Sequence, residues 1–149
     1  MKRDILIATH NLDKLKELED LLNPLQFRLH FLHELPEFLP PEEDQDTLPK
    51  NAMKKALEAA KFSGLITLAD DTGLFIAALN DAPGIMSARF AGNSCSYSDN
   101  RQKVLSLMQN TDQRKAYFKT AVALAAPDGI MAIIEGRLDG EITTEEYGN

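Results

Sequence analysis

The sequence predicts an α/β domain, in which buried strands alternate with amphipathic helices. Two short, mainly apolar runs at residues 5–8 and 65–69 lack regular polar alternation, as expected for strands buried on both faces of a parallel sheet. Segments with leucines or alanines at helical spacing follow at 12–22 and 51–63, and they predict helices packed against that sheet. At 149 residues, the chain 1–149 is long enough for one such domain with a single core.

The other segments continue this alternation. The remaining predicted elements are a strand at 27–31, an exposed Pro-rich and acidic loop at 36–46, a helix at 98–109 and paired strands at 116–126 and 130–138. The strand pair surrounds Ala126-Pro127-Asp128-Gly129, a sequence typical of a reverse turn. Residues 141–149 carry no apolar pattern, so we expect them to fray.

Composition and charge narrow the class of protein. The net charge of −7 argues against nucleic acid or an anionic membrane as the main partner. A nucleotide stays compatible with that charge, because metal and local cations can mask phosphates. The single cysteine, Cys95, excludes an internal disulfide and fits a reducing compartment. No signal peptide or membrane-spanning segment is evident, so we expect a cytoplasmic protein.

Two adjacent carboxylates mark the first candidate site. Asp70 and Asp71 directly follow the buried run at 65–69, and Thr72-Gly73 comes next. Carboxylates at the end of a buried strand supply oxygen ligands on a rigid support, as a hard divalent cation requires. The alternative is that Asp70 or Thr72 caps a following helix.

The start of the helix predicted at 12–22 is a second candidate site. Backbone N–H groups point outward at a helix start and favour an anion, and Lys14 adds a full positive charge there. A cation in the first turn is unfavourable to the helix itself, and an anionic ligand would offset that cost. The alternative is that Asn11 is an ordinary N-cap and Lys14 a solvated surface residue.

Several motifs resemble the signature of the inosine triphosphate pyrophosphatase family, also called dITP/XTP pyrophosphatases. The first runs from residue 68 to residue 92 and contains Ala69-Asp70-Asp71-Thr72-Gly73-Leu74, Pro83-Gly84 and Ser87-Ala88-Arg89-Phe90-Ala91-Gly92. The others are Thr9-x-Asn11-x-x-Lys14-x-x-Glu17 and Asn51-Ala52-x-x-Lys55-Ala56. The resemblance implies an elongated mixed β-sheet flanked by helices, and a chain shortened at its C-terminus relative to a typical member.

The resemblance also implies an activity and a site. Members split the bond between the α- and β-phosphates of deaminated purine nucleoside triphosphates (ITP, dITP, XTP) with Mg²⁺, and are commonly homodimers. It assigns the catalytic role to Asp71 and metal binding to Asp71, Asp70 and Glu42, with Glu43 as the alternate. For Glu17 it leaves two roles open, orienting Lys14 or helping to bind the metal. The residues implied to bind substrate are Thr9, His10, Asn11, Leu12, Asp13, Lys14, Thr72 and Arg89.

The sequence departs from the family pattern in two places. The usual Glu-Thr-Gly is replaced by Glu43-Asp44-Gln45, and a Glu before Asn-Ala is replaced by Lys50. The chain also stops before the family's purine-reading motifs. A catalytically weak or inactive relative that binds nucleotide or mediates dimerisation is therefore the alternative. The related Maf-type pyrophosphatases fit less well, because their first turn has Ser-x-Ser-x-x-Arg.

Overall fold

The computed structural model describes residues 2–148, which form two compact units. The first unit comprises residues 2–71 and 121–135, and the second comprises 72–120 and 136–148. One six-stranded sheet runs in the order β2-β1-β3-β5-β6, with β4 paired to β3. The strands are β1 (Asp4–Ile7), β2 (Arg28–Phe31), β3 (Ile66–Ile76), β4 (Ala82–Gly84), β5 (Lys115–Ala126) and β6 (Gly129–Glu141). This mixed α/β architecture confirms the predicted fold class.

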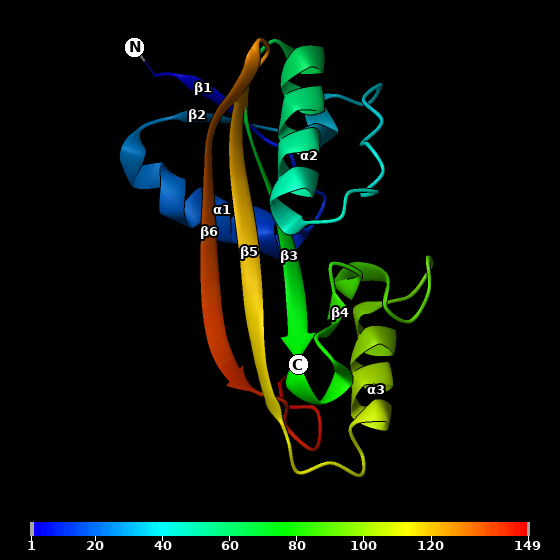
Figure 1. The fold of residues 1–149 in the computed structure, drawn as a ribbon. Helices are drawn as coiled ribbons and strands as arrows, with labels where there is room; N and C mark the ends of the chain where they lie inside the picture. The colour runs from blue at the N-terminus through cyan, green and yellow to red at the C-terminus, as the bar shows by residue number, and fades with distance from the viewer. Residues whose placement is uncertain (1, 149) are drawn as a thin grey trace. The chain divides into compact units, whose positions relative to one another are not determined.

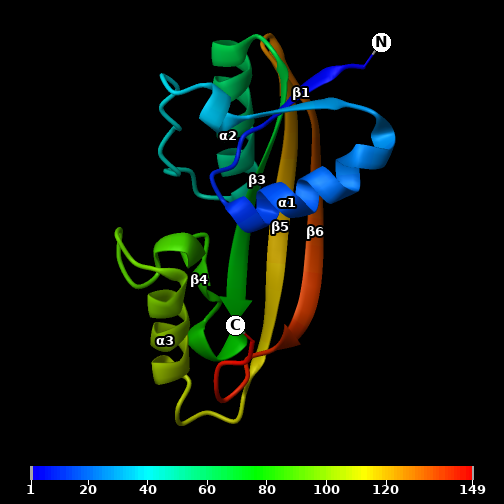
Figure 2. The ribbon, with the colours of Figure 1, turned by 180° about the vertical axis from the view of Figure 1, so that it is seen from behind.

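In the first unit, β1 is the central strand. It pairs in parallel with β2 on one side and with β3 on the other, so that Ile7 is level with both Phe31 and Leu68. Leu6 and Ile7 are fully buried, which explains their apolar run. Two helices cover opposite faces of this part of the sheet, α1 (Leu12–Leu22) on one and α2 (Leu48–Ser63) on the other (Figure 1 and Figure 2).

Helix α2 begins three residues before its predicted start. The Thr47 side chain accepts a hydrogen bond from the N–H of Lys50 and so caps the helix, and Pro49 lies in the first turn, where no N–H is needed. The helix ends at Gly64, whose left-handed φ of 74° suits glycine. Fully buried alanines at 52, 56, 59 and 60 form the close-packing face that their spacing predicts.

Strand β3 is longer than the sequence predicts. It continues from Ile66 through Asp70-Asp71-Thr72-Gly73 to Ile76, and no α-helix follows the two aspartates. The second half of the strand is held by antiparallel pairing with β4, which contains Pro83-Gly84. The turn before β4 includes Asn80 and Asp81, where φ is positive. Pairing with the neighbouring strands of the sheet overrides the local polar sequence here.

The second unit has its own small core. Helix α3 (Tyr97–Leu107) starts with a capping box formed by Ser96 and Asp99. Val104 and Met108 pack with Ile76 of β3 and Ala116 of β5. The short 3₁₀ helices of the chain are Asn23–Leu25, Leu32–Glu34, Ala77–Leu79 and Ser87–Arg89.

The C-terminal segment is held to this core, which corrects the prediction that it frays. The backbone N–H of Ile142 donates to the carbonyl of Arg114 at 2.8 Å, and Ile142 packs against the core. The Arg114 guanidinium donates to the carbonyls of Ile142 and Thr143, at 2.6 and 2.7 Å. Hydrogen bonds from one arginine to backbone carbonyls leave no apolar pattern in the sequence. The sequence therefore did not indicate that this segment is anchored.

A histidine between two carboxylates makes the stability of the first unit depend on pH. His30 Nε2 lies 2.9 Å from Asp4, and Nδ1 lies 3.0 Å from Glu34. These hydrogen bonds raise the pKa of His30 above its ordinary 6.5 and lower the pKa values of Asp4 and Glu34, with Arg28 also lowering that of Asp4. The histidine's contribution is fully present below pH 6.5 and lost as pH rises through its folded pKa.

We expect His30→Gln to lower the melting temperature most at about pH 5.5, where His30 is charged and both carboxylates are ionised. The difference between wild type and variant should shrink steadily above about pH 7. Thermal melts of both proteins across this range check the expectation. A difference that stays constant with pH would contradict it.

Candidate active site

The register of the parallel strands brings Lys14 to Asp70. Because Ile7 is level with Leu68, the turn after β1 leaves the sheet beside Asp70. Helix α1 begins directly after this turn, and the Lys14 ammonium forms an ion pair with the Asp70 carboxylate. Asp70 is only 7% exposed, so the pair is held at a largely buried site. The start of α1 and the acidic part of β3 therefore meet at Asp70.

Asp71 faces the other side of the sheet, toward α2. Successive side chains of a strand point to opposite faces. Asp71 accepts a hydrogen bond from the side chain of Asn51 on α2, and its Oδ1 lies 3.8 Å from the Nζ of Lys55 on the same helix. Lys55 also contacts Glu43 of the acidic loop, at 2.8 Å. A buried carboxylate, an amide, a lysine and a second carboxylate therefore meet on this face.

The Asp71 carboxylate is incompletely satisfied. Its Oδ2 is buried and has no hydrogen-bond partner. Burial raises the pKa of Asp71, and nearby Glu43 raises it further, while Lys55, Asn51 and Lys14 act in the opposite direction. Leaving a buried carboxylate oxygen unpaired is costly, so such an atom is expected where a ligand completes it. An oxygen of this kind fits a hard divalent cation, whose ligands are carboxylate and phosphate oxygens.

The predicted three-carboxylate cluster of Asp70, Asp71 and Glu42 is not assembled. The two aspartates face opposite sides because β3 continues through them, and Glu42 is exposed. Glu43, the alternate, is the loop carboxylate that approaches Asp71, through Lys55. Within residues 2–148, no three His, Cys, Asp or Glu side chains gather in a way that could hold a metal ion. Of the three predicted metal ligands, Asp71 is the one with a buried oxygen that lacks a hydrogen-bond partner.

At the start of α1, the capping interpretation of Asn11 is confirmed. Its side-chain oxygen accepts from the N–H groups of Asp13 and Lys14, at 3.0 and 3.2 Å. Thr9 in turn accepts from the N–H of Asn11 at 3.2 Å. His10 and Leu12 are exposed on this turn. With two first-turn N–H groups already taken by Asn11, the Lys14 side chain is the clearest means of binding an anion here.

Thr72 and Arg89, the other predicted substrate-binding residues, belong to the second unit. The Thr72 hydroxyl lies 2.8 Å from that of Thr120 on β5. Arg89 is half-buried and ends the short 3₁₀ helix at Ser87–Arg89.

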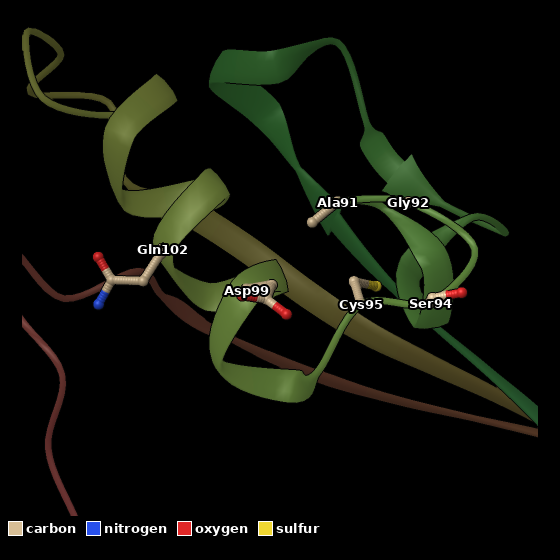
Figure 3. Close-up of a pocket in the computed structure, with 6 residues that line it drawn as sticks. All are labelled: Ala91, Gly92, Ser94, Cys95, Asp99 and Gln102. Atoms are coloured by element: carbon tan, nitrogen blue, oxygen red, sulfur yellow. The ribbon is translucent and has the colours of Figure 1, made fainter.

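An open recess of about 580 Å³ lies in the second unit beside the start of α3 (Figure 3). It is lined by Ala91, Gly92, Ser94, Cys95, Asp99 and Gln102. None of the predicted site residues lines it. The Cys95 thiol there donates to the side-chain oxygen of Asn100.

Sequence reasoning missed two members of the site, Asn51 and Lys55. Both were recognised as motif matches, but they were placed only on a helix with a small-residue face. The signal that could have found them is their spacing, because residues four apart share one face of a helix. Lys50, by contrast, lies in an exposed ion pair with Asp46 at 2.8 Å, so its charge is not directed at Asp71.

Comparison with known proteins identifies the family of this chain. The Ham1 family model matches residues 5–149. The chain belongs to the Ham1 family. Similar relatives include the dITP/XTP pyrophosphatases of Desulforamulus reducens, 43% identical over 97% of this chain and 73% of the relative, and of Geobacter sulfurreducens, 39% identical over the same shares.

Solved Ham1 structures share the fold. A HAM1 protein from Coxiella burnetii superposes with a TM-score of 0.86 and 37% identity, covering 98% of this chain and 76% of that protein. The dITP/XTP pyrophosphatase from Mycobacterium abscessus gives a TM-score of 0.79 and 35% identity, covering 97% and 77%. In the part of the chain that the structure describes, no helix has the length and apolar character needed to cross a bilayer.

The surroundings of Asp71 predict that its ionised carboxylate lowers the stability of the folded protein. Because the pKa of Asp71 is raised in the fold, its ionised form is disfavoured at neutral pH relative to the unfolded chain. Asp71→Asn should therefore raise the melting temperature in metal-free buffer by about 2–4 °C, or ~1 kcal/mol for a chain of this length. The gain should vanish below the ordinary aspartate pKa of 3.8.

The neighbouring Asp70→Asn is the matched control. It removes the ion pair with Lys14 and should lower the melting temperature. Thermal melts in the presence of a chelator measure both effects. If Asp71→Asn destabilises the protein as Asp70→Asn does, the unsatisfied carboxylate is not a strained feature of the fold.

Proposed function

We propose that this protein hydrolyses deaminated purine nucleoside triphosphates, such as dITP and XTP, to the monophosphate and pyrophosphate. The observation that carries the proposal is the state of the buried Asp71 carboxylate. Its Oδ1 lies near Lys55, and its Oδ2 has no hydrogen-bond partner. The choice of substrate is supported by the name of a 43% identical relative, a dITP/XTP pyrophosphatase. Water adds its oxygen to the α-phosphorus, the bond to the bridging oxygen breaks, and pyrophosphate leaves.

In this reaction the side chains of the first unit have distinct roles. Asp71 accepts the proton of the attacking water or orients that water, and its raised pKa makes the carboxylate a better proton acceptor. Lys14 and Lys55 neutralise charge on the phosphate oxygens when these displace their present carboxylate partners. Asp70 and Glu43 hold the two ammonium groups in place before substrate binds.

A Mg²⁺ ion is part of the proposal. The residue that would hold it is Asp71 through Oδ2, with Glu43 the nearest further carboxylate. When bound, Mg²⁺ would neutralise charge on the phosphoryl oxygens. Mg²⁺ often has only one or two protein carboxylate ligands, because it keeps several waters and binds substrate phosphates. The lack of a three-carboxylate cluster is therefore compatible with this role. We further propose, from the resemblance, that the protein is a homodimer.

We expect pyrophosphate release to be fastest from ITP and XTP and slow from dTTP and ATP, all with Mg²⁺. Asp71→Asn should lower kcat by about 10²–10⁴-fold, the usual range for loss of a general base. Pyrophosphate release measured for the four substrates checks both statements. Tight nucleotide binding without turnover would instead support a nucleotide-binding relative, and full activity of Asp71→Asn would remove Asp71 from the mechanism.

Lys14→Met should lower kcat/KM for ITP by about 10–100-fold, because a cation that stabilises transition-state charge is lost. Lys16→Met is the matched control, since Lys16 lies exposed on the same helix and should leave kcat/KM unchanged. Steady-state kinetics of the two variants make the comparison. Equal effects of the two substitutions would show that only the general charge of α1 matters.

A further inference from the structure

Asn51 is an unusual buried polar residue of the first unit. It lies in the first turns of α2, is 1% exposed, and uses both ends of its side-chain amide. Its Oδ1 accepts the backbone N–H of Gln45 at 3.0 Å, which ties the acidic loop to the helix. The same side chain forms a hydrogen bond to Asp71 on β3. Asn51 therefore joins the loop that carries Glu43 to the strand that carries Asp71.

The pattern of partners fixes how this amide is oriented. A carboxylate only accepts hydrogen bonds, so the NH₂ end of Asn51 must donate to Asp71. Asp71 Oδ1 is the oxygen that lies 3.8 Å from Lys55, and Oδ2 is the buried oxygen without a partner. Asn51 and Lys55 lie four residues apart on one face of α2, the face that approaches Asp71.

We propose that Asn51 is a positioning residue that holds Asp71 with Oδ1 turned toward α2 and Oδ2 presented to the divalent cation. This rests on the function proposed above, and it adds a residue that neither the relatives' names nor the motif assigned. Residues that orient a ligating group through a hydrogen bond are a recurrent part of metal sites, and their loss costs about 10–100-fold in metal affinity or activity. Without Asn51, the carboxylate can rotate and share both oxygens with Lys55.

A purely structural role is the competing explanation, since Asn51 also anchors the loop at Gln45. Two variants separate the roles. Asn51→Leu removes both hydrogen bonds while keeping the side-chain volume similar. Gln45→Pro removes the backbone N–H that Asn51 accepts and leaves the amide free to bind Asp71. Thr67→Val, at a fully buried position of β3, controls for the loss of a buried hydrogen bond elsewhere.

The test is calorimetric titration of Mn²⁺, as a substitute for Mg²⁺, into each folded protein without nucleotide. We expect Asn51→Leu to bind Mn²⁺ about 10–100-fold more weakly than wild type. Gln45→Pro and Thr67→Val should bind like wild type. Asn51→Ala serves as a second variant if the leucine does not fit. Circular dichroism and thermal melts verify that each variant is folded.

Three results would overturn the inference. The first is that Asn51→Leu and Asn51→Ala bind Mn²⁺ with wild-type affinity. The second is that Gln45→Pro loses as much Mn²⁺ affinity as Asn51→Leu, which would mean that Asn51 acts through the loop. The third is that the wild type does not bind Mn²⁺. The failure of the proposed function is distinguishable. A wild type that binds Mn²⁺ through the Asn51-dependent site, but releases no pyrophosphate from any triphosphate, would leave the inference standing and refute the activity.

Discussion

The parallel pairing of β1 with β3 is the constraint on which the candidate site depends. With Ile7 level with Leu68, the turn that starts α1 must leave the sheet beside Asp70, and Lys14 follows in the first helical turn. The same strand then carries Asp71 to the opposite face, where α2 supplies Asn51 and Lys55. A shift of this register by one residue would exchange the faces of both aspartates and separate each from its present lysine or amide.

The charges of the site largely cancel before any ligand binds. Asp70 is paired with Lys14, and Glu43 with Lys55, so that both lysines are ordered and partly desolvated. Asp71 is the exception, because burial raises its pKa and one of its oxygens has no partner. Such a group lowers the stability of the fold. In return, a polar group that is already fixed in place does not have to reorganise during a reaction. The strain is thus concentrated on the one carboxylate with the proposed catalytic role.

Much of this arrangement could be predicted from the sequence, and the errors arise where contacts outside the local pattern decide the structure. Apolar runs and helical spacing located β1, α1 and α2 closely, because local patterns determine them. The sequence did not indicate that β3 continues through Asp70-Asp71-Thr72-Gly73, because this depends on pairing with the neighbouring strands of the sheet and not on the local polar sequence. Within residues 2–148, the two aspartates are not gathered with Glu42 because successive side chains of the continued strand face opposite sides. The anchoring of the C-terminal segment by Arg114 likewise depends on contacts 28 residues apart.

The central claim is that Asp71 is the point at which a divalent cation and the triphosphate meet. The most direct test is paramagnetic broadening of backbone amide resonances when Mn²⁺ and a non-hydrolysable ITP analogue are added together. The account predicts that the signals of Asp70, Asp71 and Lys55 broaden first, and that those of the exposed acidic pair Glu145 and Glu146 do not. Broadening centred on Glu145 and Glu146, or spread evenly over the acidic surface, would contradict it.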